Sequence, residues 1–106
     1  MKRYKIVVFV PESDAERLRQ AMGEAGAGRI GNYSFCSFSV KGVGRFRPDA
    51  GADPAIGAVG SLEAVAEERI ETVCTEKNLD AVLRAIALTH PYEEPATDIY
   101  ALETIG

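Results

Sequence analysis

The chain of 106 residues has the length of one domain, and its 46% hydrophobic content suffices for one buried core, so residues 1–106 predict a single globular domain. Its formal net charge of −4 argues against a nucleic-acid surface, which needs concentrated Lys and Arg. No apolar run approaches the roughly 18 residues of a membrane span. We therefore expect a cytoplasmic protein without membrane or nucleic-acid partners, in which Cys36 and Cys74 are buried reduced thiols.

The first elements in chain order are a buried strand and an amphipathic helix. Residues 4–10 (YKIVVFV) are almost all apolar and rich in β-branched side chains, which is typical of a central strand covered on both faces. Ser13 followed by Glu16 matches a capping box, so we expect a helix to begin there. Gly26 marks its end, because glycine readily adopts the left-handed conformation that terminates helices.

The second half of the chain predicts three more strands and one more helix. Residues 33–40 (YSFCSFSV) alternate apolar and polar side chains toward their end, the pattern of a half-buried strand. Residues 69–75 predict the third strand and residues 97–102 the last. Between them, apolar residues at i, i+3, i+4 and i+7 from Leu79 predict a helix that Pro91 limits.

The order β-α-β-β-α-β predicts the α+β class and, within it, the ferredoxin-like split βαβ sandwich. In this architecture a four-stranded antiparallel sheet carries both helices on one face. We expect the first and third strands in the middle of the sheet.

The connection between the second and third predicted strands is far longer than a hairpin loop. Residues 42–61 contain five glycines and two prolines, and connections beyond about 12–15 residues are usually functional or held by a partner. Glycine permits close backbone approach to a ligand, and arginine pairs with carboxylate or phosphate. The candidate ligand-binding residues here are Gly42, Gly44, Arg45, Phe46 and Arg47. Three alternatives stay open: a bent hairpin whose Phe46 anchors a neighbouring subunit, an anion or nucleotide site, and a solvated loop.

A second chemically rich stretch, THPYEEPATD at residues 89–98, holds the chain's one histidine. His90 continues the apolar stripe of the preceding helix, so we expect its side chain to lie partly beneath the helix end. His90 and Tyr92 are further candidate ligand-binding residues. His90, Glu93 and Glu94 are candidate ligands for a divalent metal, but a closed zinc site needs further ligands from another subunit. A structural turn, a general acid–base group and contact with a ligand are the other readings.

The string HPYEEPATDIY at residues 90–100, together with VKGVGRFRPDAG at residues 40–51, resembles the inserted domain of YqfO-type proteins in the Nif-three-like family. The resemblance spans essentially the whole chain and implies a stand-alone form of that domain, similar in fold to PII signalling and CutA proteins. It also implies self-association, as a dimer or trimer. The two-metal site of the family's flanking domains is not implied, because this chain has no second histidine.

These features predict a small homo-oligomeric PII/CutA-like module that binds a small molecule or protein partner and is not an enzyme. The two irregular connections would form its recognition surface, brought together by self-association. A second hypothesis is a metal-binding protein or metal-dependent enzyme with His90 and Glu94 as ligands at a subunit interface. A third is a domain that only oligomerises.

Overall fold

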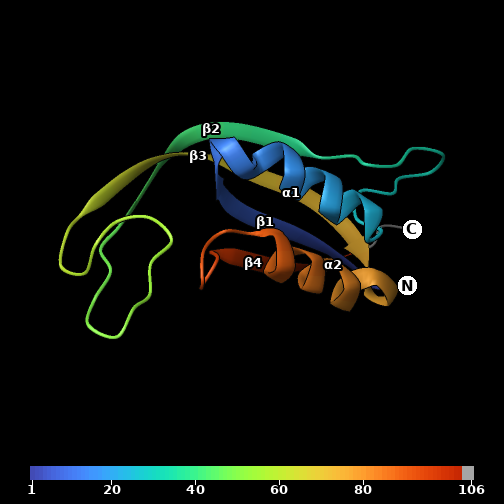
Figure 1. Ribbon diagram of the computed structural model, residues 1–106. Coiled ribbons are helices and arrows are strands. Elements are labelled where there is room, and N and C mark those ends of the chain that lie inside the picture. The colour runs from blue at the N-terminus through green and yellow to red at the C-terminus, as the bar shows by residue number, and fades with distance from the viewer. Residues whose placement is uncertain (104–106) are drawn as a thin grey trace.

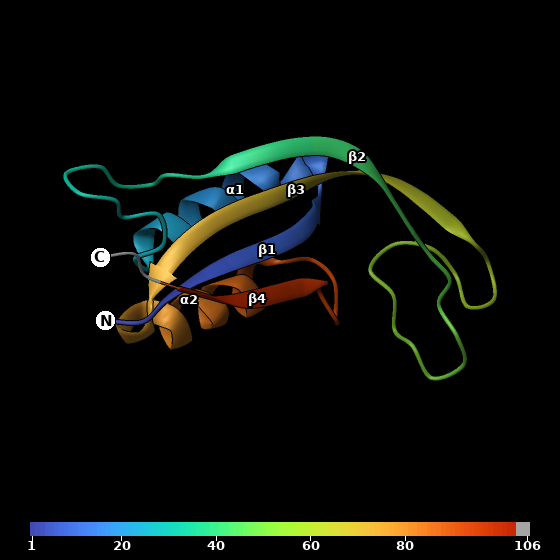
Figure 2. The ribbon, with the colours of Figure 1, turned by 180° about the vertical axis from the view of Figure 1, so that it is seen from behind.

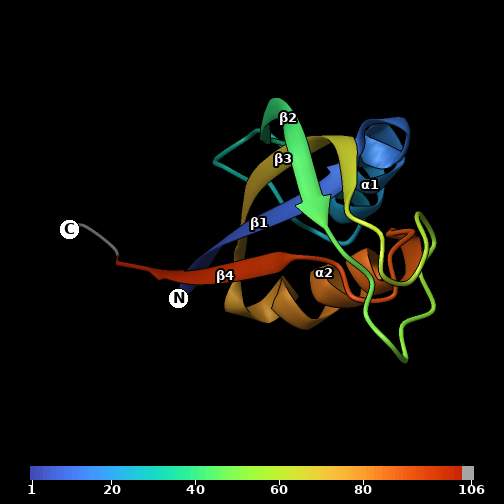
Figure 3. The ribbon, with the colours of Figure 1, turned by 90° about the vertical axis from the view of Figure 1, so that its left-hand side faces the viewer.

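The computed structural model, which describes residues 1–103, consists of one sheet and one layer of helices (Figure 1). The sheet has the order β2-β3-β1-β4, and all neighbouring strands are antiparallel. Its strands are β1 (Arg3–Pro11), β2 (Phe38–Phe46), β3 (Glu63–Thr75) and β4 (Thr97–Leu102). Helices α1 (Glu12–Glu24) and α2 (Glu76–Thr89) lie on the same face of the sheet (Figure 3). The predicted fold class and the central position of the first and third strands are confirmed.

The core lies between the two helices and the sheet. Ile6, Val8 and Val10 of β1 face the helices and are fully buried, as are Leu18 of α1 and Val82 of α2. Removing each such side chain from water stabilises the fold by roughly 1.5–3 kcal/mol. Successive side chains of a strand point to opposite faces of the sheet, so these three residues, at every second position of β1, share the face toward the helices.

Helix α1 begins without the predicted capping box. Its N-cap is Pro11, and no side chain caps the helix start. The Ser13 hydroxyl donates to the neighbouring aspartate at 3.3 Å, and Glu16 pairs with Arg19 at 3.1 Å. The prediction is wrong because β1 runs directly into the helix, which places Ser13 inside the first turn instead of before it.

The second strand lies further along the chain than predicted. Residues 33–37 belong to a separate loop, because the Cys36 amide donates to the Gly28 carbonyl at 2.9 Å and Phe35 has a left-handed φ of 59°. β2 instead includes the opening of the glycine segment, up to Phe46. The two cysteines are free, but only Cys74 is fully buried, and burial raises the pKa of its thiol.

Both α2 and the strand that follows it agree with the sequence prediction. α2 ends at Thr89, and His90 is extended with φ −67° and ψ 136°, as expected for a residue before proline. β4 has the predicted bounds, and its last residue, Leu102, pairs with Arg3 at the start of β1. Within the described residues 1–103, no helix combines the length and apolar character needed to cross a membrane.

The β2–β3 hairpin is longer than the rest of the sheet. β3 begins at Glu63, earlier than predicted, and its first residue pairs with Phe46. The hairpin bends past the end of β1 and carries the connection 47–62 beyond it, as Figure 2 shows from the side that the helices leave uncovered. The glycine segment therefore lies at one end of an elongated molecule.

Leu18→Ala should lower the free energy of unfolding by about 2–5 kcal/mol, because it leaves a cavity between α1 and the sheet. Leu88→Ala, on the exposed side of α2, is the matched control and should change it by less than about 0.5 kcal/mol. Urea unfolding followed by circular dichroism measures both. Equal losses in the two variants would contradict this assignment of the core.

Candidate functional site

The two irregular segments meet in a single chain, at the end of the molecule opposite Arg3 and Leu102. The connection 47–62 folds back toward the turn between α2 and β4 (Figure 1). The Asp53 amide donates to the Glu93 carboxylate at 2.9 Å and joins the two segments directly. Together with the ends of β1, β2 and β3 they enclose a cavity of about 380 Å³. No second copy is needed to bring them together, which differs from the sequence-based expectation.

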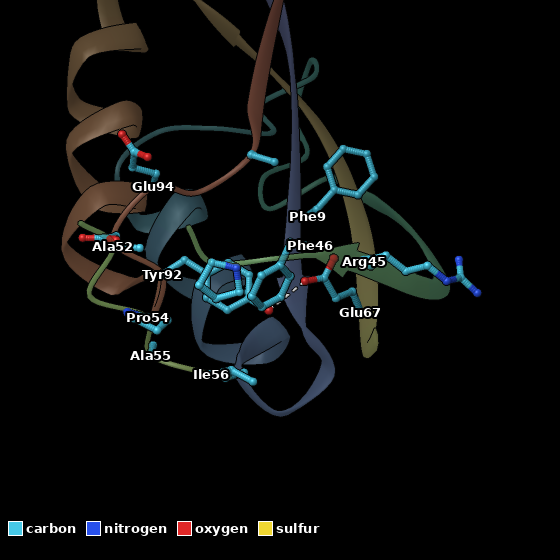
Figure 4. Close-up of a pocket in the computed structure, with 14 residues that line it drawn as sticks. Phe9, Arg45, Phe46, Ala52, Pro54, Ala55, Ile56, Glu67, Tyr92 and Glu94 are labelled. Carbon is cyan, nitrogen blue, oxygen red and sulfur yellow. Dashed lines mark hydrogen bonds between the residues drawn. The ribbon is translucent and has the colours of Figure 1, made fainter. Parts of the chain in front are cut away.

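The Tyr92 ring forms the centre of the cavity wall (Figure 4). Its hydroxyl donates to Glu67 Oε2 at 2.9 Å. Its ring meets Phe46 edge-on, with centroids 5.6 Å apart and an interplanar angle of 62°, a favoured arrangement for aromatic pairs. Phe9 and Ile56 add apolar surface from β1 and from the glycine segment. One tyrosine of the turn thus contacts both strands of the long hairpin.

Glu67 lies on β3 and is only 7% exposed. Its carboxylate occupies the space above Gly44 of β2, where any Cβ atom would collide with Glu67 Oε1. Gly44 therefore leaves room for this carboxylate in its present position, and it has no left-handed backbone angle. Sequence reasoning missed Glu67. The available signal was an acidic residue three positions before the buried Ile70, opposite a segment with two glycines.

The environment of Tyr92 affects its ionisation. Burial raises the pKa of the Tyr92 phenol above its ordinary value and is the largest cause of the shift. The hydrogen bond to Glu67 and the negative charge of that carboxylate raise this pKa further. The phenol consequently remains a proton donor to Glu67 throughout the neutral range. This bond keeps one oxygen of a buried carboxylate satisfied.

His90 is placed beneath the end of α2, as expected, with an exposed fraction of 6%. Its Nε2 lies 2.7 Å from the Phe9 carbonyl oxygen, and the Tyr92 amide donates to its Nδ1 at 3.1 Å. Because a carbonyl only accepts and an amide N–H only donates, the two bonds together select the neutral tautomer protonated on Nε2. Both ring nitrogens therefore hold the backbone of the turn, and His90 itself does not line the cavity.

The other candidate residues divide into two groups. Gly44, Arg45, Phe46 and Tyr92 line the cavity. Gly42 lies along a neighbouring hollow of the open sheet face. Arg47 turns away and pairs through Nε with Asp49 at 3.0 Å.

The candidate metal ligands form no cluster in one chain. Within residues 1–103, no group of three or more His, Cys, Asp or Glu side chains is placed to hold a metal ion. His90 uses both nitrogens on the backbone, and Glu93 accepts from Asp53. A metal site with His90, Glu93 or Glu94 would need a rearranged turn and ligands from a second copy, and it stays a prediction.

Comparison with known proteins identifies relatives of the whole chain. No family model matches it. GTP cyclohydrolase 1 type 2 homolog of Halalkalibacterium halodurans is 51% identical over 107 residues, which cover 97% of this chain and 29% of that protein. The crystal structure of a Bacillus cereus protein related to NIF3 matches with a TM-score of 0.84 and 47% identity, over 97% of this chain and 26% of that one. The chain is a domain of the type found within these Nif3-like proteins. It spans less than a third of their length.

More distant structures show the fold. CutA from Synechococcus elongatus matches with a TM-score of 0.68 at 20% identity, over 95% of this chain and 77% of that one. The Bacillus subtilis GlnK–ATP complex matches with a TM-score of 0.58 at 14% identity, over 95% and 82%. The PII/CutA-like variant of the ferredoxin-like sandwich, expected from the sequence, is confirmed.

Tyr92→Phe should lower the free energy of unfolding at neutral pH by about 1–3 kcal/mol, because the buried Glu67 carboxylate would lose its donor. Since the folded pKa of Tyr92 is raised, the stability from its protonated phenol is complete below about pH 10 and is lost as pH rises further. The unfolding free energy of Tyr92→Phe should therefore fall less steeply above this pH. Urea unfolding at several pH values tests this against Tyr100→Phe, whose ring is half exposed on β4; parallel profiles for all three proteins would contradict it.

Proposed function

We propose that this PII/CutA-like domain is a ligand-binding module and not a catalyst, and that the cavity between the glycine segment and the turn 90–96 is its binding site. The observation that carries the proposal is that three separate contacts at one cavity fasten the turn 90–96 to segments far from it in the sequence, namely the glycine segment and β3. These are the Phe46–Tyr92 ring pair, the Tyr92–Glu67 hydrogen bond and the Asp53–Glu93 hydrogen bond. Several independent contacts make a preformed cavity, which lowers the cost of binding.

The chemistry of the cavity supports binding. Its volume of about 380 Å³ is within the range of roughly 300–1,000 Å³ typical of ligand pockets. Aromatic, proline and aliphatic side chains dominate its walls, and a few polar groups converge on them, as in most small-molecule sites. The residue best suited to acid–base chemistry, His90, is occupied with backbone groups. The cyclohydrolase name belongs to relatives of which this chain spans 29%, and we assign this part of them to recognition.

We also propose that copies of the chain associate through the open face of the sheet. Phe38, Val40 and Tyr100 are about half exposed or more, and alternation places them on the face opposite the helices. On the same face, Glu71 pairs with both Lys5 and Arg69, at 3.9 and 3.5 Å, so its charge is already offset within one copy. Apolar side chains gathered on an open face are typical of an interaction surface.

Ala52→Trp should abolish small-molecule binding, because the indole would fill the cavity that Ala52 lines. Ala58→Trp is the matched control, in the same segment but outside the cavity wall, and should bind as the unmodified chain does. A fragment screen observed through the amide resonances of the protein measures this. If fragments shift only amides far from Asp53 and Tyr92, the proposed site is wrong; if none binds while the protein still assembles, the role is assembly alone.

Phe38→Asp should dissociate the assembly, because it places an unpaired charge in the apolar interface. Leu88→Asp, at an even more exposed apolar position on α2, should leave the molecular mass unchanged. Light scattering after size-exclusion chromatography gives the mass of each variant. A monomeric unmodified chain, or dissociation by the Leu88 variant alone, would contradict association through this face.

A further inference from the structure

The charges around the cavity are mainly negative. Glu67, Glu93 and Glu94 contribute carboxylates, and Arg45 contributes the single guanidinium among the side chains that line it within residues 1–103. The Arg45 guanidinium points away from the Tyr92 ring, whereas the Glu67 carboxylate points toward it (Figure 4). The pair of arginines that favoured an anion site in the sequence is thus not assembled at the cavity, because Arg47 pairs with Asp49.

Glu67 is the polar group best placed to recognise a ligand. It is more than nine-tenths buried, and its Oε2 accepts from Tyr92. Within residues 1–103, its Oε1 receives no hydrogen bond and has no cation at salt-bridge distance. Among residues 1–103, Thr97 Oγ1 is the one sealed side-chain oxygen or nitrogen without a partner, so Glu67 Oε1 keeps contact with open space, where a donor that arrives with a ligand can reach it. A hydrogen bond to a charged oxygen in this largely buried setting contributes more than one to an exposed acid.

The apolar part of the cavity fits a flat molecule. Tyr92 and Phe46 present an edge-to-face aromatic pair, and Phe9 adds a third ring. Aromatic rings attract planar apolar groups, and their faces attract cations. Phe9 already interacts with a cation on one side, since the Arg69 guanidinium carbon lies 5.6 Å from its ring centroid.

We propose that the cavity takes an organic cation, a molecule with a flat apolar body and a protonated amine, and that Glu67 Oε1 accepts a hydrogen bond from that amine. This inference rests on the proposed binding function and adds the charge class of the ligand. Phosphates and carboxylates are disfavoured, because their charge would face the buried carboxylate of Glu67, while the Arg45 guanidinium points away from the Tyr92 ring (Figure 4).

Three probes that share an indole ring test this inference by titration calorimetry: tryptamine as the cation, tryptophol as the neutral analogue and indole-3-propionate as the anion. We expect tryptamine to bind at least about tenfold more tightly than tryptophol, the gain of one hydrogen bond to a charged group. Indole-3-propionate should bind most weakly. This ranking is measured on the unmodified chain, so it does not depend on the folding of any variant.

Glu67→Gln keeps an oxygen that accepts from Tyr92 but removes the charge, so tryptamine should lose its advantage while tryptophol changes by less than about threefold. Asp80→Asn removes the same charge from an exposed position on α2 and should preserve the ranking.

Equal binding of tryptamine and tryptophol would overturn the cation proposal and leave the cavity as a binding site. Stronger binding of indole-3-propionate, or an unchanged ranking in Glu67→Gln, would overturn it as well. Absence of binding for all three probes would contradict both the cation proposal and the proposed function.

Discussion

The hydrogen bond between Tyr92 and Glu67 is the interaction on which this end of the molecule depends. Glu67 lies on a strand of the sheet and is buried, and a charge in such a place requires a donor. The donor comes from the turn after α2, so satisfying one carboxylate also fixes the turn against the hairpin. The same ring then contacts Phe46, beyond which the connection 47–62 begins.

Backbone contacts complete the attachment of the turn. The imidazole of His90 joins the Phe9 carbonyl of β1 to the Tyr92 amide, and it does so in one neutral tautomer. The turn is thus held to β1 through His90, to β3 through Glu67 and to the glycine segment through Asp53 and Glu93. Three attachments to three different elements give the cavity defined walls in a part of the chain that is otherwise irregular.

Local patterns in the sequence predicted most of the fold, and non-local contacts account for what they missed. The apolar stripe before Pro91 predicted α2, and the strand-favouring composition of residues 97–102 predicted β4, because both signals depend on nearby residues alone. The second strand was predicted too early in the chain, because glycine is uncommon in strands and β2 contains Gly42 and Gly44. Gly44 leaves room for the Glu67 carboxylate across the hairpin, a non-local contact that local patterns do not reveal. For the same reason Glu67 was not predicted as part of the candidate site. Tyr92 was predicted, because it lies in a stiff turn flanked by prolines.

The pairing of Arg3 with Leu102 places the first residue of β1 beside the last residue of β4. Both of these strand ends lie remote from the cavity, so a folded unit attached there would not obstruct its opening. β1 is one of the two central strands of the sheet, and toward its other end the Phe9 carbonyl holds the His90 side chain.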